Sequence, residues 1–132
     1  MISEMKQRVL IAEDSRVMAK VMQLNLARAG FEAEVAENGL LAWERLCEEP
    51  FDLLLTDFQM PEMEGDELCR LLRQCALNAD IPVILVSAKG FEIDIPGLKR
   101  EVGIADVIYK PFSPRQIVET VKRTLSPTPL PS

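Results

Sequence analysis

The chain has 132 residues, enough for one domain with one core, and 48% of them are hydrophobic, as in a globular rather than a disordered protein. Its 15 basic and 21 acidic residues give a net charge of −6, which argues against direct nucleic-acid binding, and the absence of histidine excludes a serine–histidine triad, histidine-ligated zinc and a phosphohistidine on this chain. No apolar run could span a membrane and the first eight residues do not resemble a signal peptide, so we expect a soluble cytoplasmic protein that does not contact membranes.

Short apolar segments alternate along the chain with segments of helical periodicity. In chain order the sequence predicts a strand at Arg8–Ala12, a helix from Ser15 to Ala29, a strand at Phe31–Ala36, a helix from Asn38 through Cys47, a strand at Phe51–Thr56, a helix at Glu64–Cys75, strands at Pro82–Val86 and Asp106–Tyr109, and a helix from Ser113 to about Leu125. Ser15 and Ser113 suit N-caps, and Gly30 suits a helix end.

The segment between the last two predicted strands breaks this alternation because it contains Pro96-Gly97. Inside a helix, proline costs roughly 3 kcal/mol and glycine about 1 kcal/mol. We therefore expect a short fourth helix that begins near Pro96, with Gly90–Ile95 irregular and mobile.

Repeated alternation of strands and helices predicts a parallel sheet with helices on both faces. The strands around Leu10, Leu54 and Leu85 are apolar on both sides, as central strands should be. We expect an α/β fold with a doubly wound, five-stranded parallel sheet of flavodoxin type and strand order 2-1-3-4-5. Residues 7–125 would form the domain, with an N-terminal extension at 1–6 and a Pro-rich tail or linker at 126–132.

The three cysteines, Cys47, Cys69 and Cys75, are odd in number and do not have the spacing of a metal site. All three fall in apolar helical patterns. We expect them to be reduced and buried or half-buried.

Polar side chains stand at the carboxyl ends of four predicted strands. Glu13-Asp14 follow the first strand, Asp57 the third, Ser87 the fourth and Lys110 the fifth. Parallel strands end at one edge of a sheet, and ligands bind there where the strand order reverses. These groups should therefore converge on one crevice.

Three neighbouring carboxylates repel one another unless a cation neutralises them. An all-oxygen pocket with few protein ligands suits Mg²⁺, and Mn²⁺ could replace it. Beside such an ion Asp57 is a candidate phosphoryl acceptor that forms an acyl phosphate. Ser87 could hydrogen-bond a phosphoryl oxygen, and Lys110 could pair with its charge.

Five separate elements together resemble the receiver domain of bacterial two-component response regulators, of the chemotaxis-regulator type, over about residues 7–125. They are Glu13-Asp14, Asp57 with Met60-Pro61 and Gly65, Ser87-Ala88, and Lys110-Pro111-Phe112.

The resemblance implies that Asp57 takes a phosphoryl group from a histidine of a sensor histidine kinase or a histidine phosphotransfer protein. It implies that Glu13, Asp14, Asp57 and the backbone carbonyl of Gln59 hold the Mg²⁺. It also implies a signalling switch, not an enzyme, because such a domain promotes only its own phosphorylation and dephosphorylation. An output domain could follow on a longer chain.

The resemblance further implies that Ser87 is a switch hydroxyl, that Lys110 is the family's invariant lysine, and that the Lys110–Pro111 bond is cis. Members of this family usually have an aromatic residue three positions before the lysine, but this chain has Val107 there. Tyr109 is next to Lys110 and is expected on the opposite side of the strand from it, so it is not expected to be a substitute. Output contacts, and a candidate homodimer, would use the face of the fourth helix, fifth strand and fifth helix. Ordering of residues 90–95 could replace an aromatic flip as the relay.

Other functions remain open from the sequence. A Mg²⁺-dependent aspartyl-phosphate phosphohydrolase would also place an aspartate after a strand, but Gln59 stands where such enzymes usually carry a second aspartate. A nucleotide-binding flavodoxin-like protein is disfavoured because the first loop has no glycines to cradle a phosphate. A degenerate receiver that only binds partners is disfavoured because every acceptor-site group is present.

Overall fold

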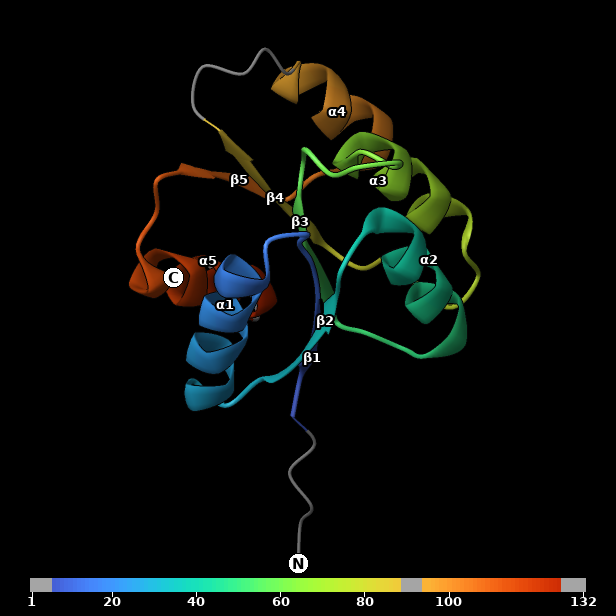
Figure 1. Cartoon of the computed structure of the whole chain (residues 1–132). Coiled ribbons are helices and arrows are strands. Elements are labelled where there is room, and N and C mark those ends of the chain that lie inside the picture. Colours follow the sequence, from blue (N-terminus) through green and yellow to red (C-terminus); the bar gives the residue numbers. More distant parts are fainter. Residues whose placement is uncertain (1–5, 89–93, 127–132) are drawn as a thin grey trace, which may run out of the picture.

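The computed structural model describes residues 6–88 and 94–126. Within these stretches strands and helices alternate along the chain (Figure 1). They are β1 Arg8–Ala12, α1 Arg16–Arg28, β2 Glu32–Ala36, α2 Gly39–Glu48, β3 Leu53–Asp57, α3 Gly65–Gln74, β4 Val83–Ala88, α4 Ile95–Val102, β5 Asp106–Lys110 and α5 Pro114–Leu125. The expected N-terminal extension and C-terminal tail lie outside the described residues except for residues 6 and 126.

All neighbouring strands pair in parallel, in the order β2-β1-β3-β4-β5. The predicted doubly wound topology is thereby confirmed. Because β1 and β3 are neighbours, the loops that leave them lie next to each other at the point where the strand order reverses.

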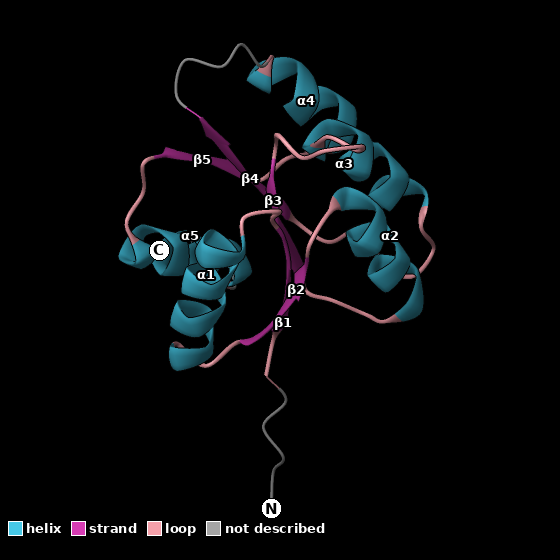
Figure 2. Ribbon diagram, viewed as in Figure 1, coloured by secondary structure: helices cyan, strands magenta, loops and turns pink. Residues whose placement is uncertain are grey.

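The helices form one layer on each face of the sheet (Figure 2). α1 and α5 cover one face, and α2, α3 and α4 cover the other. Successive strand residues alternate between the two layers: in β3, Leu53 and Leu55 belong to the core under α1 and α5, and Leu54 to the core under α2 to α4. Both faces of the central strands are therefore dry, which explains their continuous apolar sequences.

Three strands differ from the sequence prediction at their ends. β3 extends to Asp57, β4 to Ala88 and β5 to Lys110. The polar residues Asp57, Ser87 and Lys110 therefore lie on the ladder and not in the loops after it. The backbone continues to pair there, since the Phe58 N–H donates to the Val86 carbonyl at 2.8 Å. The apolar pattern ends before the hydrogen-bonded ladder does, because the last residues of these strands lie at the carboxyl edge of the sheet.

α4 begins at Ile95, one residue before the predicted start, so Ile95 is helical and not irregular. The Asp94 side chain accepts the Gly97 N–H at 3.0 Å and caps the helix. Pro96 lies in the first turn, where its missing N–H costs nothing. A side chain at position 97 would overlap the Asp94 carboxylate, which explains a glycine there. Residues 90–93 of the expected irregular segment lie outside the described residues.

The cysteines differ in exposure. Cys69 and Cys75 are buried as expected, but Cys47 is exposed, so this part of the prediction was wrong. Gly39, Ala42 and Leu46 are the buried residues of α2. Residue 47 lies one helical step beyond that buried line and turns toward solvent.

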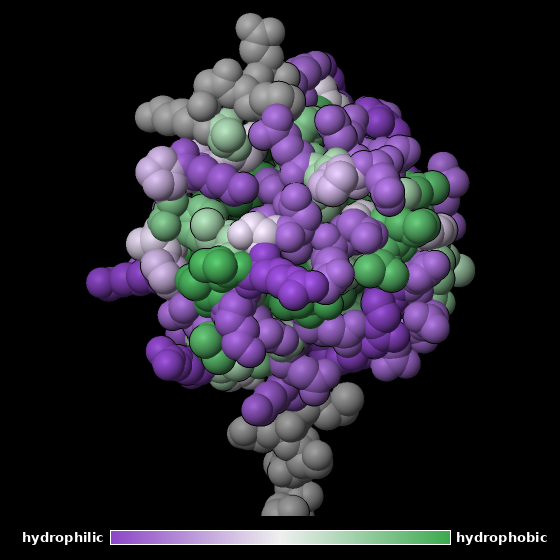
Figure 3. Space-filling view, in the orientation of Figure 1, coloured by the Kyte–Doolittle hydropathy of each residue, from purple (hydrophilic) through white to green (hydrophobic). Residues whose placement is uncertain are grey.

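The face of the molecule seen in Figure 3 is mostly hydrophilic, with separate hydrophobic patches. In the part of the chain that the structure describes, the exposed large hydrophobic residues are Val17, Leu24, Leu40, Leu41, Leu77 and Tyr109. Among the described residues, no helix is both long and apolar enough to cross a bilayer.

Candidate functional site

The three predicted carboxylates converge at the carboxyl edge of β1 and β3. One oxygen each from Glu13, Asp14 and Asp57 lies within 4.8 Å of the other two. Asp57 ends β3 and is 4% exposed, Glu13 follows β1 and is 2% exposed, and Asp14 is exposed. The cluster therefore has two buried members and one that opens to solvent.

Lys110 joins this cluster from β5. Its Nζ atom lies 3.4 Å from Oδ2 of Asp57, and the ammonium is partly exposed. Ser87 is buried one residue beyond Val86, the ladder partner of Asp57. Its hydroxyl donates to the Ala88 carbonyl at 3.4 Å. Lys110 thus contacts the Asp57 carboxylate, whereas Ser87 bonds to its own strand.

Burial decides the charge state of the cluster. Loss of water around Glu13 raises its pKa to about 7; the N–H of Ser15 opposes this shift, and the charge of Asp57 adds to it. Burial likewise raises the pKa of Asp57, against the opposing charge of Lys110. Near neutral pH the Glu13 carboxyl is therefore protonated in part of the molecules, and a bound cation would displace that proton.

The two oxygens of Glu13 differ in their partners. Oε2 accepts the Ser15 N–H at 3.0 Å, whereas Oε1 is buried and has no hydrogen-bond partner in the described part of the chain. Buried carboxylate oxygens are normally satisfied. An orphaned oxygen beside two more carboxylates is the donor set that a hard cation such as Mg²⁺ takes, so these residues fit the predicted ion.

Gln59 also borders the cluster. It follows Asp57 by two positions, is exposed, and its backbone N–H favours the charged form of the Asp57 carboxylate. The role predicted for its backbone carbonyl stays a prediction.

A glycine positions α3 against the end of β3. A Cβ atom on Gly65 would lie 2.8 Å from the Asp57 carbonyl oxygen and 3.0 Å from the Phe58 Cα. The Gly65 N–H donates to the Phe58 carbonyl at 2.7 Å. The absence of a side chain lets the first turn of α3 pack directly on the backbone that carries Asp57. The sequence motif contained this glycine, but its spacing did not reveal the contact.

The β4–β5 ladder confirms that Tyr109 and Lys110 point to opposite sides of β5. The ladder pairs Ser87 with Tyr109 and Leu85 with Val107. Residues two apart on a strand point to the same side, so Tyr109 shares the face of Val107 and Ser87 and is opposite only to Lys110. Tyr109 is 45% exposed, whereas Val107 packs on the core. The Lys110–Pro111 peptide bond, expected to be cis, is cis.

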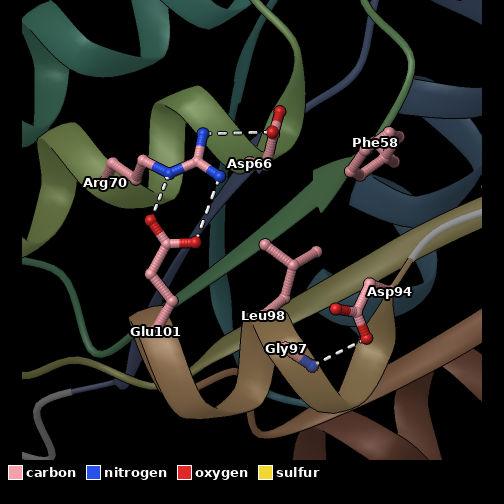
Figure 4. Close-up of a pocket in the computed structure, with 7 residues that line it drawn as sticks. All are labelled: Phe58, Asp66, Arg70, Asp94, Gly97, Leu98 and Glu101. Carbon is pink, nitrogen blue, oxygen red and sulfur yellow. Dashed lines mark hydrogen bonds and ion pairs between the residues drawn. The ribbon is translucent and has the colours of Figure 1, made fainter.

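A pocket of about 280 Å³ opens between α3 and α4, beside Phe58 (Figure 4). Arg70 of α3 crosses its rim: Nε and Nη2 donate to the Glu101 carboxylate of α4 at 2.6 and 3.1 Å, and Nη1 donates to Asp66 at 3.1 Å. The Asp66–Arg70 spacing of four residues could have indicated this pair, but no sequence signal indicated Glu101. The carboxylate cluster does not line this pocket.

Comparison with known proteins agrees with this geometry. A sequence profile described as the response regulator receiver domain matches residues 9–122. The chain is 40% identical over 121 residues to the phosphate regulon transcriptional regulatory protein PhoB of Pseudomonas aeruginosa, covering 91% of this chain and 52% of that protein. It is 33% identical over 119 residues to the uncharacterized transcriptional regulatory protein YclJ of Bacillus subtilis, covering 89% and 50%. The chain thus spans about half the length of these relatives.

Solved structures with the same fold include a chemotaxis protein, CheY4 of Vibrio cholerae. It superposes with a TM-score of 0.84 at 26% identity and covers 92% of this chain and 100% of that one. The receiver domain of a sensor histidine kinase from Pseudomonas aeruginosa superposes with a TM-score of 0.80 at 22% identity, covering 92% and 98%, and holds a magnesium ion in its active site cleft.

Proposed function

Because the chain belongs to the response regulator receiver domain family, we propose that it accepts a phosphoryl group on Asp57 from a phosphohistidine on a partner protein. The partner would be a sensor histidine kinase or a histidine phosphotransfer protein, since this chain has no histidine of its own. Receiver domains of two-component systems are signalling switches and are generally not classed as enzymes.

The single observation that carries the proposal is the composition of the cluster. Three carboxylates within 4.8 Å of one another include an orphaned buried oxygen on Glu13, and Lys110 lies 3.4 Å from Asp57. A purely structural cluster would satisfy its buried oxygens internally. A cluster that binds a cation and a phosphoryl group would have buried oxygens without protein hydrogen-bond partners, because the ligand supplies the partner.

The reaction places the nucleophile on Asp57. A carboxylate oxygen attacks phosphorus, the oxygen–phosphorus bond forms, the phosphorus–nitrogen bond breaks, and the leaving imidazole keeps the electron pair and takes a proton. Lys110 would pair with a phosphoryl oxygen, and the Ser87 hydroxyl would give up the Ala88 carbonyl to donate to another.

The Mg²⁺ would be held by Glu13, Asp14, Asp57 and the backbone carbonyl of Gln59, and when bound it would neutralise the charge of the phosphoryl oxygens. Before that, burial keeps the Glu13 carboxyl partly protonated by raising its pKa to about 7, and burial also raises the pKa of Asp57. Ion binding should therefore release protons near neutral pH.

For the output we propose the face of α4, β5 and α5, which could also carry an output domain contact or a homodimer. Tyr109 is the aromatic residue on this face that is nearest the site in the ladder, because it pairs directly with Ser87. A hydroxyl that moves toward a phosphoryl group would open space beside Tyr109, which is 45% exposed. The relay through residues 90–95 stays a prediction, because residues 90–93 lie outside the described residues.

The decisive experiment is intact mass spectrometry after incubation with acetyl phosphate and Mg²⁺. Wild type should gain one phosphoryl mass, and Asp57→Asn should gain none. Asp80→Asn, which changes an exposed aspartate of the α3–β4 loop, is the matched control and should behave as wild type. A gain that persists in Asp57→Asn would contradict the assignment, and continuous phosphate release from p-nitrophenyl phosphate would favour the phosphohydrolase.

A further inference from the structure

Two of the three cysteines meet at the far end of α2 and α3, which pack against each other on one face of the sheet (Figure 1). Cys47 lies in the last turn of α2 and is exposed; Cys75 is the C-cap residue of α3 and is buried. The Cys75 thiol donates to the Leu46 carbonyl at 3.2 Å, directly beside the Cys47 backbone. One thiol is thus open to solvent, and the other is held behind it.

The buried side chain of Asn78 fixes these two segments relative to each other. Its Nδ2 donates to the carbonyls of Leu46 at 2.6 Å and Glu49 at 2.8 Å, and its Oδ1 accepts the Phe51 N–H at 2.9 Å. Asn78 follows Cys75 by three residues, so the frame holds both cysteine-bearing turns. The position of Cys75 next to α2 is therefore fixed by the hydrogen bonds of Asn78, which we call the Asn78 network.

The environment also separates this pair from the third cysteine. Burial and the neighbouring Cys75 thiol raise the pKa of Cys47, so the two thiols interact, and only a small fraction of Cys47 is thiolate at neutral pH. Cys47 reacts because it is exposed and not because it is unusually acidic. Cys69 is fully buried in α3, and burial raises its pKa to about 12. Cys69 is therefore neither accessible to a reagent nor available as a thiolate.

We propose that Cys47 and Cys75 form an oxidisable pair that closes to an intramolecular disulfide when the protein meets a low-molecular-weight disulfide such as oxidised glutathione. Cys47 is the entry thiol because it is exposed, and Cys75 is the resolving thiol because it is held next to it. The site would be a redox modification site on the face of α2 and α3.

The exchange has two balanced steps. The Cys47 thiolate attacks one glutathione sulfur, the glutathione disulfide bond breaks, and one glutathione leaves as a thiol. The Cys75 sulfur, after losing its proton, attacks the Cys47 sulfur and releases the second glutathione. In sum the two cysteines lose two protons and two electrons, and the glutathione disulfide gains them as two glutathione thiols.

Closure would not leave a buried acceptor unpaired. Oxidation removes the Cys75 hydrogen that is donated to the Leu46 carbonyl, but the same carbonyl also accepts from Asn78 Nδ2. The usual penalty for a lost buried hydrogen bond is therefore small here. Because helices run antiparallel to the strands, the pair also lies at the edge of the sheet opposite Asp57, and the inference does not rest on the proposed function.

The test exposes the reduced, folded chain to oxidised glutathione and measures intact mass and linked peptides. Wild type should lose two hydrogens and yield one Cys47–Cys75 peptide. Cys75→Ser should stop at one glutathione on Cys47, and Cys47→Ser should gain nothing. Cys69→Ser is the matched control and should close as wild type does.

Three outcomes would overturn the proposal: a linkage that includes Cys69, a glutathione adduct on Cys47 of wild type that never closes, or no reaction of wild type. Circular dichroism checks the fold of each variant. If Cys75→Ser does not fold, Cys75→Ala should also stop at one glutathione on Cys47. The peptide map of oxidised wild type shows directly which cysteines are linked and needs no variant.

Discussion

Glu13 and Asn78 are both 2% exposed, yet their surroundings differ at opposite edges of the sheet. Both polar atoms of the Asn78 amide have partners, with two hydrogen bonds donated and one accepted. Glu13 has one oxygen bonded to Ser15 and one without a partner among the described residues. The same burial serves stability in one case and, we infer, a ligand in the other.

The difference shows how a buried polar group can be interpreted. A satisfied amide joins three backbone groups and contributes stability, and it has no donor hydrogen left for a ligand. An incompletely satisfied carboxylate costs stability and persists where a bound group compensates for it. The two residues are equally buried, so what distinguishes them is whether each polar atom has a hydrogen-bond partner within the described stretches: both polar atoms of Asn78 have one, and one oxygen of Glu13 does not.

The largest expected effect on stability comes from removing the Asn78 side chain and its hydrogen bonds. Asn78→Ala leaves the Glu49 carbonyl and the Phe51 N–H without their Asn78 partners, and the Leu46 carbonyl keeps the weak Cys75 thiol donor. We expect the change to lower the free energy of unfolding by about 3 kcal/mol. Urea denaturation would measure the loss. The control Asn25→Ala removes a single bond to Val21 within α1 and should cost about 0.5 kcal/mol or less. Equal effects of the two changes would contradict the role given to Asn78.

The second prediction concerns Mg²⁺ binding. Glu13→Gln keeps the shape of the side chain but removes its charge, and we expect Mg²⁺ affinity to fall roughly tenfold or more. Isothermal titration calorimetry would measure it. Glu37→Gln, an exposed glutamate at the same edge of the sheet, should stay within about twofold of wild type. Unchanged affinity in Glu13→Gln would remove Glu13 from the ion site.

The third prediction uses the pH dependence of stability without Mg²⁺. The pKa of Glu13 is about 7 when folded and 4.5 as its ordinary value, so between these values the folded chain binds more protons than the unfolded chain. Stability from this group is therefore present below about 4.5, falls as pH rises, and is lost above about 7. Relative to wild type, Glu13→Gln should gain stability steadily across this window.

Urea midpoints of both proteins at a series of pH values would check this prediction. Saturating Mg²⁺ should reverse the order above pH 7, because only wild type would bind the ion tightly. If the two pH profiles run parallel, the pKa of Glu13 in the folded protein is not raised and the prediction is wrong.

The smallest effect is expected at the exposed pair between α3 and α4. Arg70 is 43% and Glu101 50% exposed at the side chain, and water screens such pairs. Arg70→Ala should lower the free energy of unfolding by about 0.5 kcal/mol, close to the control Arg115→Ala on α5. Urea denaturation of both variants would measure this. A loss above about 2 kcal/mol would mean that Arg70 holds α4 in place.

Much of the fold was predictable because apolar period and length report directly on burial. The continuous apolar runs of β1, β3 and β4 predicted central strands, and the alternation of elements then allowed few topologies. The serine caps at Ser15 and Ser113 followed from local hydrogen bonding, and both accept the expected N–H, at 3.3 and 3.1 Å. Strand ends were less predictable, since Asp57 and Lys110 are polar residues on the ladder.

By itself the sequence determined the order of the strands and therefore which polar residues share one edge: Glu13, Asp14, Asp57, Ser87 and Lys110. That inference needs only the rule that parallel strands end together. Only the tertiary structure decided which buried polar atoms find partners, which side of β5 carries Tyr109 beside Ser87, and which cysteine stands in front of another. Those relations depend on contacts between segments far apart in the chain, and local periodicity contains no information about them.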